Sequence, residues 1–284
     1  MKDRDRSVPA KLPISETPHL RFLRTVREHE LDRALAFFPS SRECGIPQTV
    51  LEIGAGTGQQ ARSLSDKGYR VVAIDLASSH YRNDRVFDVK EYDGRNIPMP
   101  ARSVDIVFSS NVLEHVHEID AFLEETRRVM TEDGISIHIL PSSACRLWGI
   151  PAHYIWLAQR IFARLVSARE HDIPASAHIA VPRTPQSMRE WLGTLFPMRH
   201  GERGVTLTEA YYYSQHWWCR KFRENEFEIV RVSGNGLFYT MANALTDSLD
   251  LKKRRLLSRV LGDACHIYVL KRSEKHRKAQ HSTI

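Results

Sequence analysis

The sequence predicts an α/β protein built on a doubly wound parallel sheet, and three observations lead to that prediction. Short apolar runs rich in β-branched residues alternate with runs of helical spacing, which requires parallel strands joined by right-handed crossovers. Three glycines stand at every second position after the first of these strands. Acidic or amide residues recur where the strands end, which is the edge at which such sheets bind ligands.

The elements follow one another in a regular order. Apolar residues between positions 20 and 38 share one helical face, so we expect a helix that covers the sheet, and two more helices at 59–67 and 119–134. The expected strands lie at residues 49–53, 69–74, 86–92, 104–108 and 135–140. Asp75, Asp93 and Asn111 then fall at the ends of the second, third and fourth strands. Further along, we expect a helix at 215–225 and two more strands at 227–233 and 265–270.

Composition is that of an ordinary globular protein of 284 residues, with 42% apolar and 26% charged residues. The first residues have no apolar core, so we expect no signal peptide. The four cysteines lie far apart and indicate neither a zinc site nor a disulfide framework. We therefore expect a cytoplasmic protein, and the sequence leaves its oligomeric state open.

The net charge of +7 favours anionic partners, although much of it is local. The run from Lys252 to Arg255 and the end of the chain hold many of the basic residues, and a solvated helix face or tail explains both. We divide the chain into a flexible arm (1–17), a main domain (18–141 and 215–272), a mainly helical insertion after the fifth strand (142–214) and a basic tail (273–284).

The glycine turn indicates which nucleotide the sheet binds. The residues from Glu52 to Gly58 read E-x-G-x-G-x-G, whereas the dinucleotide pattern G-x-G-x-x-G would need a glycine at Gln59. A carboxylate just before the glycines repels a pyrophosphate but suits a ligand with an ammonium group. This stretch and the order of strands over about residues 48–141 resemble the class I S-adenosylmethionine-dependent methyltransferases, in particular their type 11-like domain. A bare structural turn could have the same spacing.

The resemblance implies a Rossmann-like methyltransferase fold, in which a seventh, antiparallel strand lies between the fifth and the sixth. S-adenosyl-L-methionine is the expected cofactor, and the expected binding residues are Glu52, Gly54, Ala55, Gly56, Gly58, Asp75, Leu76, Asp93, Gly94, Ser110 and Asn111. Asp75 lies where a carboxylate can accept both ribose hydroxyls, although it could instead cap the next helix. In the family, Leu76 packs on adenine, Asp93 and Gly94 hold its amino group, and Ser110 and Asn111 line the methionine end.

His115 is the candidate catalytic residue, because an imidazole has a suitable pKa and follows the fourth strand closely. It could equally pack at the start of a helix. The sequence indicates no metal site. The alternatives to methyl transfer are a non-catalytic cofactor-binding or interaction module and, with less support, a nicotinamide-dependent oxidoreductase.

The acceptor is open between a small molecule, a saccharide, a lipid-linked molecule and RNA, with oxygen as the preferred nucleophile. All five tryptophans lie in the insertion or in the helix that follows it, which suits an aromatic-walled acceptor site. We expect the insertion to cap the carboxyl ends of the strands, with His153, His178 or Tyr212 reaching the acceptor. The basic, acid-free stretch at 150–169 could also contact an anionic membrane.

Overall fold

The computed structural model describes residues 18–39, 46–167, 195–240 and 249–273, with the side chains of 18–20 and 163–167 left out. The predicted N-terminal arm (1–17) and nearly all of the basic tail (273–284) lie outside the described residues. The main domain and both ends of the insertion lie within them.

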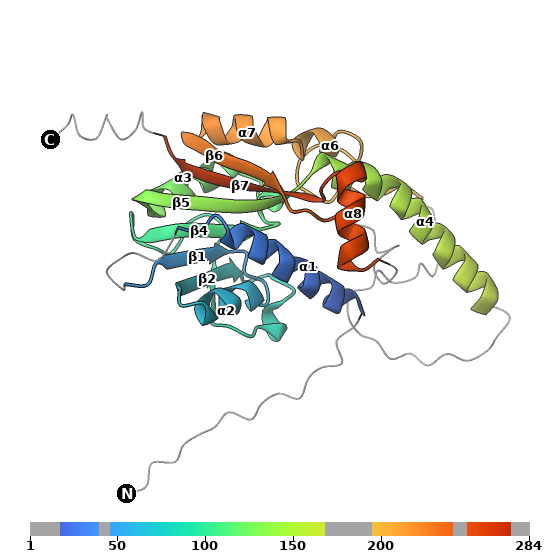
Figure 1. The fold of residues 1–284 in the computed structure, drawn as a ribbon, viewed down its shortest axis with the longest axis horizontal. Helices are drawn as coiled ribbons and strands as arrows, with labels where there is room; N and C mark the ends of the chain where they lie inside the picture. The colour runs from blue at the N-terminus through green and yellow to red at the C-terminus, as the bar shows by residue number, and fades with distance from the viewer. Residues whose placement is uncertain (1–17, 40–45, 168–194, 241–248, 274–284) are drawn as a thin grey trace, which may run out of the picture.

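A single seven-stranded sheet forms the centre of the molecule, in the order β3-β2-β1-β4-β5-β7-β6 (Figure 1). Its strands are β1 (Thr49–Ile53), β2 (Arg70–Leu76), β3 (Val89–Tyr92), β4 (Val104–Ser110), β5 (Met130–Pro141), β6 (Phe227–Gly234) and β7 (Cys265–Arg272). The first five strands are parallel, and β7 runs antiparallel to both β5 and β6. The predicted fold, including its antiparallel seventh strand, is confirmed.

Helices cover both faces of the sheet. They are α1 (Pro18–Leu35), α2 (Gln59–Asp66), α3 (Ile119–Val129), α4 (Ser143–Ser167), α6 (Glu209–Tyr212), α7 (Gln215–Glu224) and α8 (Leu251–Leu261), with short 3₁₀ turns η1 (Arg82–Asp84) and η2 (Leu113–His115). In Figure 1, α1 lies in front of the sheet and α3 behind it. One apolar core joins the sheet to α3 and α7, and a second joins its other face to α1 and α2.

The strand sequences account for this double covering. Every residue of β1 is buried, as expected for an inner parallel strand with both faces covered. In β7, Ile267 and Val269 contribute to the core under α1, whereas Tyr268 and Leu270 contribute to the core under α7. The alternation follows from the two-residue period of a strand, so a single strand stabilises both layers.

Polar caps begin two of the helices. The hydroxyl of Ser214 accepts a hydrogen bond from the backbone N–H of Trp217 at the start of α7, and the carboxylate of Asp250 does the same for Lys253 in α8. Each cap satisfies one of the N–H groups that a first helical turn leaves free.

The structure corrects two details of the sequence reading. The third helix ends at Val129, not at Gly134, because Met130 already pairs with Val104 and is fully buried in β5. The basic run that begins α8 is not all solvated. Arg254 is buried, and its guanidinium donates to the backbone carbonyls of Leu249 and Phe238.

The described part of the insertion is helical where it leaves the sheet. Helix α4 starts directly after β5 and extends away from the body of the molecule (Figure 1). Its first turns pack beside α6, near the end of the insertion. Residues 168–194 of the insertion lie outside the described residues.

A buried ion pair joins the two ends of the insertion. The Nε of Arg146 in α4 lies 2.8 Å from Oε2 of Glu209 in α6, and both side chains are almost fully buried. The guanidinium of Arg146 also donates to the backbone carbonyls of Thr206 and Met198. The segment before α6 is therefore fixed to the start of α4.

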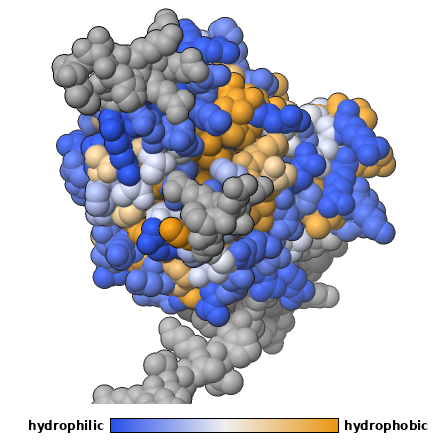
Figure 2. Space-filling view, turned by 60° about the vertical axis from the view of Figure 1, so that its left-hand side comes forward, coloured by the Kyte–Doolittle hydropathy of each residue, from blue (hydrophilic) through white to orange (hydrophobic). Residues whose placement is uncertain are grey.

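Hydrophilic residues make up most of the face seen in Figure 2, and hydrophobic residues gather in a hollow on it. Within the described residues, no helix combines the length and the apolar character needed to span a bilayer.

We predict that Arg146→Met lowers the free energy of unfolding by about 3 to 5 kcal/mol, because it leaves the Glu209 carboxylate buried without its cation. Denaturant unfolding followed by circular dichroism measures the change. Arg220→Met is the control, since Arg220 pairs with Glu224 on an exposed face of α7 and should cost less than about 1 kcal/mol. Equal losses in the two variants would contradict the importance of the buried pair.

Candidate active site

A cavity of about 1050 Å³ opens at the carboxyl ends of the parallel strands. Its wall includes Gly54 and Gly56 after β1, Asp75 at the end of β2, and Asn111 after β4. These residues meet because β1 lies between β2 and β4 in the sheet. His115 and His200 form the part of the wall nearest the insertion.

The glycines of the turn after β1 allow neighbouring side chains to pack closely against its backbone. A Cβ on Gly54 would lie 2.3 Å from Cγ2 of Val112, so only glycine lets the loop after β4 approach. A Cβ on Gly58 would lie 2.7 Å from Cβ of Phe87, and Gly58 also has a left-handed φ of +76°. Gly58 and the buried Ala55 do not line the cavity, so the ligand side of the turn consists of Gly54 and Gly56.

Asp75 lines the cavity at the end of β2 and is held by two backbone hydrogen bonds. Its Oδ2 accepts from the backbone N–H of Gly56 at 2.9 Å, and its Oδ1 accepts from the N–H of Leu76 at 2.8 Å. The first bond joins the end of β2 to the glycine turn. An ionised carboxylate can accept about four hydrogen bonds, so both oxygens keep capacity for further donors.

Glu52 is placed differently from the sequence expectation. Its side chain is buried in β1, outside the cavity wall, and Oε2 has no hydrogen-bond partner among the described residues. Burial, together with the charge of Asp75, raises the pKa of Glu52 to about 8. The Glu52 carboxyl therefore does not contact a ligand in the cavity directly. It can affect such a ligand only through the glycine turn that lies between them.

Asp93, Gly94 and Leu76 lie together on the cavity wall. The carboxylate of Asp93 accepts from the Asn96 side-chain amide and from the backbone N–H groups of Arg95 and Asn96. These bonds hold the turn after β3 and lower the pKa of Asp93 to about 2. A Cβ on Gly94 would lie 2.9 Å from Cδ2 of Leu76, so the glycine allows this turn to approach β2.

Ser110 and Asn111 end β4. Asn111 lines the cavity with a left-handed φ of 56°, and its backbone N–H donates to the carbonyl of Ile139 in β5. Its side-chain amide donates to the hydroxyl of Ser110, which lies behind the wall. The Asn111 side chain is thus held at the cavity wall just after β4.

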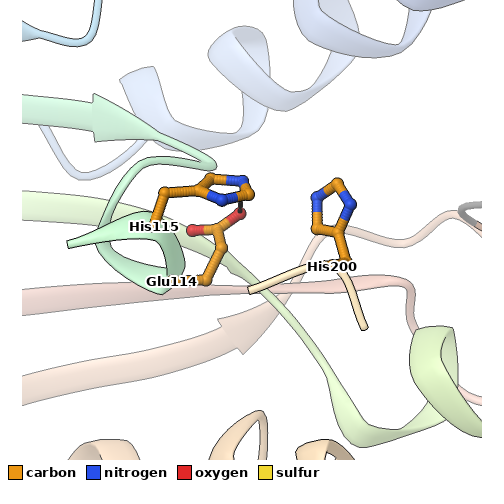
Figure 3. Close-up of side chains that lie close together, drawn as sticks. All are labelled: Glu114, His115 and His200. Carbon is orange, nitrogen blue, oxygen red and sulfur yellow. Dashed lines mark ion pairs between the residues drawn. The ribbon is translucent and has the colours of Figure 1, made fainter. Parts of the chain in front are cut away.

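His115 and His200 line the cavity, and the buried Glu114 lies next to them, behind the wall (Figure 3). The rings of His115 and His200 lie edge to face, 4.8 Å apart between centroids. The Nε2 of His115 lies 3.9 Å from Oε1 of the buried Glu114. Although both imidazoles remain accessible, the protein around them displaces enough water to lower their pKa values, to about 4 for His200. Burial raises the pKa of Glu114 to about 8.

Several residues of the site escaped the sequence reading. His200 reaches the cavity from the insertion, whereas His153 contacts Tyr154 and Trp156 on α4 and Tyr212 packs against Trp217. His178 lies outside the described residues.

Arg27, from α1, lines the cavity and pairs with Glu30 at 2.6 Å. The only sequence signal for it was a charged pair, spaced one helical turn apart, within the helix that covers the sheet.

Comparison with known proteins agrees with this geometry. Residues 51–138 match a family model described as a methyltransferase domain. A probable S-adenosylmethionine-dependent methyltransferase of Mycolicibacterium smegmatis is 29% identical over 152 residues, which cover 50% of this chain and 56% of that protein. Malonyl-acyl-carrier protein O-methyltransferase of Yersinia pestis is 37% identical over 92 residues, or 30% of this chain and 34% of that protein. This chain thus covers less than two thirds of the length of either relative.

Among solved structures, a candidate S-adenosylmethionine-dependent methyltransferase of Listeria monocytogenes has a TM-score of 0.51 at 13% identity, covering 89% of this chain and 100% of that chain. This likeness concerns the fold. The sheet order and the matched family model together show a methyltransferase domain over residues 51–138 on the class I S-adenosylmethionine-dependent methyltransferase fold, as the sequence predicts. The cofactor of this class is S-adenosyl-L-methionine.

We predict that Gly58→Ala destabilises the fold more than Gly68→Ala. Both glycines have a left-handed φ, which costs an alanine about 1 to 2 kcal/mol, but a Cβ on Gly68 would meet no atom within 4 Å. Crowding against Phe87 should add about 1 to 3 kcal/mol for Gly58→Ala. Denaturant unfolding of the two variants measures the difference, and equal losses would mean that the crowding at Gly58 is relieved without cost.

Proposed function

We propose that this protein transfers the methyl group of S-adenosyl-L-methionine to an oxygen nucleophile of a small-molecule, saccharide or lipid-linked acceptor. One observation carries the proposal: a single cavity reaches from the glycine turn and Asp75 to His115 and His200. Displacement at a methyl group needs both reactants in one space, with the reacting atoms about 3 to 3.5 Å apart. At about 1050 Å³, the cavity is large enough for a nucleoside cofactor beside an acceptor.

The wall near the sheet has the groups that this cofactor requires. The Asp75 carboxylate has free acceptor capacity for ribose hydroxyls, and Leu76 offers an apolar side chain next to the turn of Asp93 and Gly94. Gly54 and Gly56 leave the backbone of the turn open to close approach. When bound, S-adenosyl-L-methionine supplies a methyl group already activated by its sulfonium. In our proposal Ser110 acts only by orienting Asn111, and Glu52, Ala55 and Gly58 support the turn.

At the other end of the cavity, we propose that the acceptor binds next to His115. Its side chain is 42% exposed, so a hydroxyl in the cavity can reach the imidazole. A neutral imidazole can accept the proton that the hydroxyl loses or hold the acceptor oxygen by a hydrogen bond. His200 flanks the same position.

The insertion (142–214) is, in this proposal, the cap that selects the acceptor. Supporting this role, its described end contributes His200 to the cavity wall, and the guanidinium of Arg203 donates to the backbone carbonyls of Leu113 and Val116 in the turn that includes His115. The name of the Yersinia pestis relative, an O-methyltransferase, is consistent with an oxygen acceptor. A cytoplasmic location stays a prediction.

A direct test combines cofactor titration with a labelled-methyl transfer screen against cell extract separated into metabolite, lipid-linked, RNA and protein pools. We expect cofactor binding together with transfer to the metabolite or lipid-linked pool. Transfer to RNA would contradict the acceptor class. Binding without transfer to any pool would favour a non-catalytic cofactor-binding module.

We predict that Asp75→Asn weakens cofactor binding about ten- to a hundredfold. Hydrogen bonds to a charged group contribute about 1.5 to 3 kcal/mol, and the amide offers only one accepting oxygen. Isothermal titration calorimetry with S-adenosyl-L-methionine measures the dissociation constant. The control is Asp84→Asn, an exposed aspartate of η1 outside the cavity wall, which should bind as the unmodified protein does. Equal dissociation constants for both variants would exclude Asp75 as the ribose contact.

We predict that His115→Gln lowers turnover about a hundredfold or more while the dissociation constant of the cofactor stays within about twofold. The reason is that His115 contacts the acceptor and not the cofactor. His216→Gln is the matched control, because His216 is an exposed histidine of α7 outside the cavity wall. Turnover within about threefold of the unmodified protein for His115→Gln would remove this residue from the mechanism.

A further inference from the structure

Three side chains with metal-binding atoms converge at the acceptor end of the cavity. One carboxylate oxygen of Glu114 and one ring nitrogen each of His115 and His200 lie within 4.8 Å of one another. They come from two segments far apart in the sequence, η2 after β4 and the end of the insertion. Figure 3 shows the Glu114 carboxylate and both imidazole rings in this arrangement.

Glu114 is the unusual member of this cluster. Its side chain is fully buried, and neither carboxylate oxygen has a hydrogen-bond partner among the described residues. A carboxyl group buried without a hydrogen-bond partner is stabilised either by staying protonated or by a cation beside it. Glu114 can therefore act as the anionic ligand of a cation that binds next to it.

The charges of Arg27 and Arg203 lower the pKa of Glu114, but both guanidinium groups bond to other partners. The guanidinium of Arg203 donates to the carbonyls of Leu113 and Val116 and lies over the ring of Trp217, 5.2 Å from its centroid. Arg27 pairs with Glu30 at 2.6 Å. Neither arginine hydrogen-bonds to the Glu114 carboxylate in the described structure, whereas ring nitrogens of His115 and His200 lie within 4.8 Å of it.

Backbone contacts hold the donors in place before any ion binds. The N–H of His200 donates to Oε1 of Glu209 at 2.7 Å, and the N–H of Glu202 donates to the backbone carbonyl of Glu114 at 2.9 Å. The N–H of His115 donates to the carbonyl of Val112 at 2.9 Å. These bonds join the insertion directly to η2, so the three donor atoms stay near one another.

We propose that Glu114, His115 and His200 form a binding site for a divalent first-row transition metal ion of the zinc type. Two imidazoles and one carboxylate are a ligand set typical of zinc and non-haem iron sites, whereas Mg²⁺ and Ca²⁺ favour oxygen ligands. Metal–ligand distances of about 2.0 to 2.2 Å require the donors to draw closer together, and rotation of the two accessible imidazole rings provides that movement.

With three protein ligands, the ion keeps a fourth position for a ligand from the cavity. This role rests on the proposed methyl transfer. With the ion bound, His115 acts as its ligand and not as the base. A hydroxyl oxygen of the acceptor in the fourth position then loses its proton to solvent more easily, because the ion stabilises the alkoxide. The oxygen then forms a bond to the methyl carbon while the carbon–sulfur bond breaks, and the electron pair leaves with sulfur as S-adenosylhomocysteine.

The site is tested by isothermal titration calorimetry of the full chain, prepared without a polyhistidine tag and stripped with a chelator, using Zn²⁺ and separately Mg²⁺. We expect one Zn²⁺ per chain and much weaker binding of Mg²⁺. Glu114→Gln and His200→Gln should each weaken Zn²⁺ binding at least about a hundredfold, since loss of a supporting outer ligand alone costs about 10- to 100-fold. The control His216→Gln should bind Zn²⁺ as the unmodified protein does, since His216 lies outside the cavity wall.

Substitution with Co²⁺ gives a second readout, because visible absorption bands report direct ligation and should be lost in His200→Gln. Absence of a stoichiometric Zn²⁺ site, equal affinity for Mg²⁺, or unchanged affinity in Glu114→Gln would each overturn the proposal. Circular dichroism verifies that the variants are folded. Since the titration uses neither cofactor nor acceptor, its result is independent of methyl transfer: Zn²⁺ binding without turnover refutes the proposed function, and turnover without Zn²⁺ binding refutes the site.

Discussion

The Glu209 carboxylate holds the end of the insertion against the open edge of the sheet. One oxygen accepts the backbone N–H groups of His200 and Gly201, at 2.7 and 2.6 Å, and the other pairs with Arg146 at the start of α4. Because this carboxylate is fully buried, losing any of these partners would leave a charge without compensation. The segment before α6 therefore has one stable position, and that position brings the His200 ring to His115.

The two ends of the cavity consequently depend on different forces. Around Asp75, the wall consists of strand ends in a parallel sheet, where hydrogen-bonded register and close backbone packing at Gly54 determine the geometry. Around His115, the wall depends on an insertion held by one buried ion pair and a few backbone hydrogen bonds. The end of the cavity at the sheet is thus determined by the strands, whereas the end at His115 also depends on the insertion.

The elements of the sheet could be predicted from the sequence because their order along the chain follows a regular pattern. The strands, their order and the residues at their ends could be predicted. Strand-like runs that alternate with helix-like runs require a parallel sheet, and the carboxyl ends of parallel strands lie at one edge. Sequence reasoning was less successful within the glycine turn. The spacing of glycines does not reveal which of them faces a ligand and which allows a neighbouring segment to approach, and Gly58 packs against Phe87 outside the cavity.

The sequence by itself determined the fold class and the order of the strands, because the alternation of strand and helix patterns is local, and it placed Asp75, Asp93 and Asn111 at strand ends. Only the tertiary structure brought Glu114 and His200 next to His115, which the sequence had singled out. His200 has no distinguishing neighbour in the sequence, and Glu114 looks like one more charged residue of a short turn. Their meeting depends on a buried ion pair between α4 and α6, and a contact between residues so far apart in the chain has no local pattern that a sequence could display.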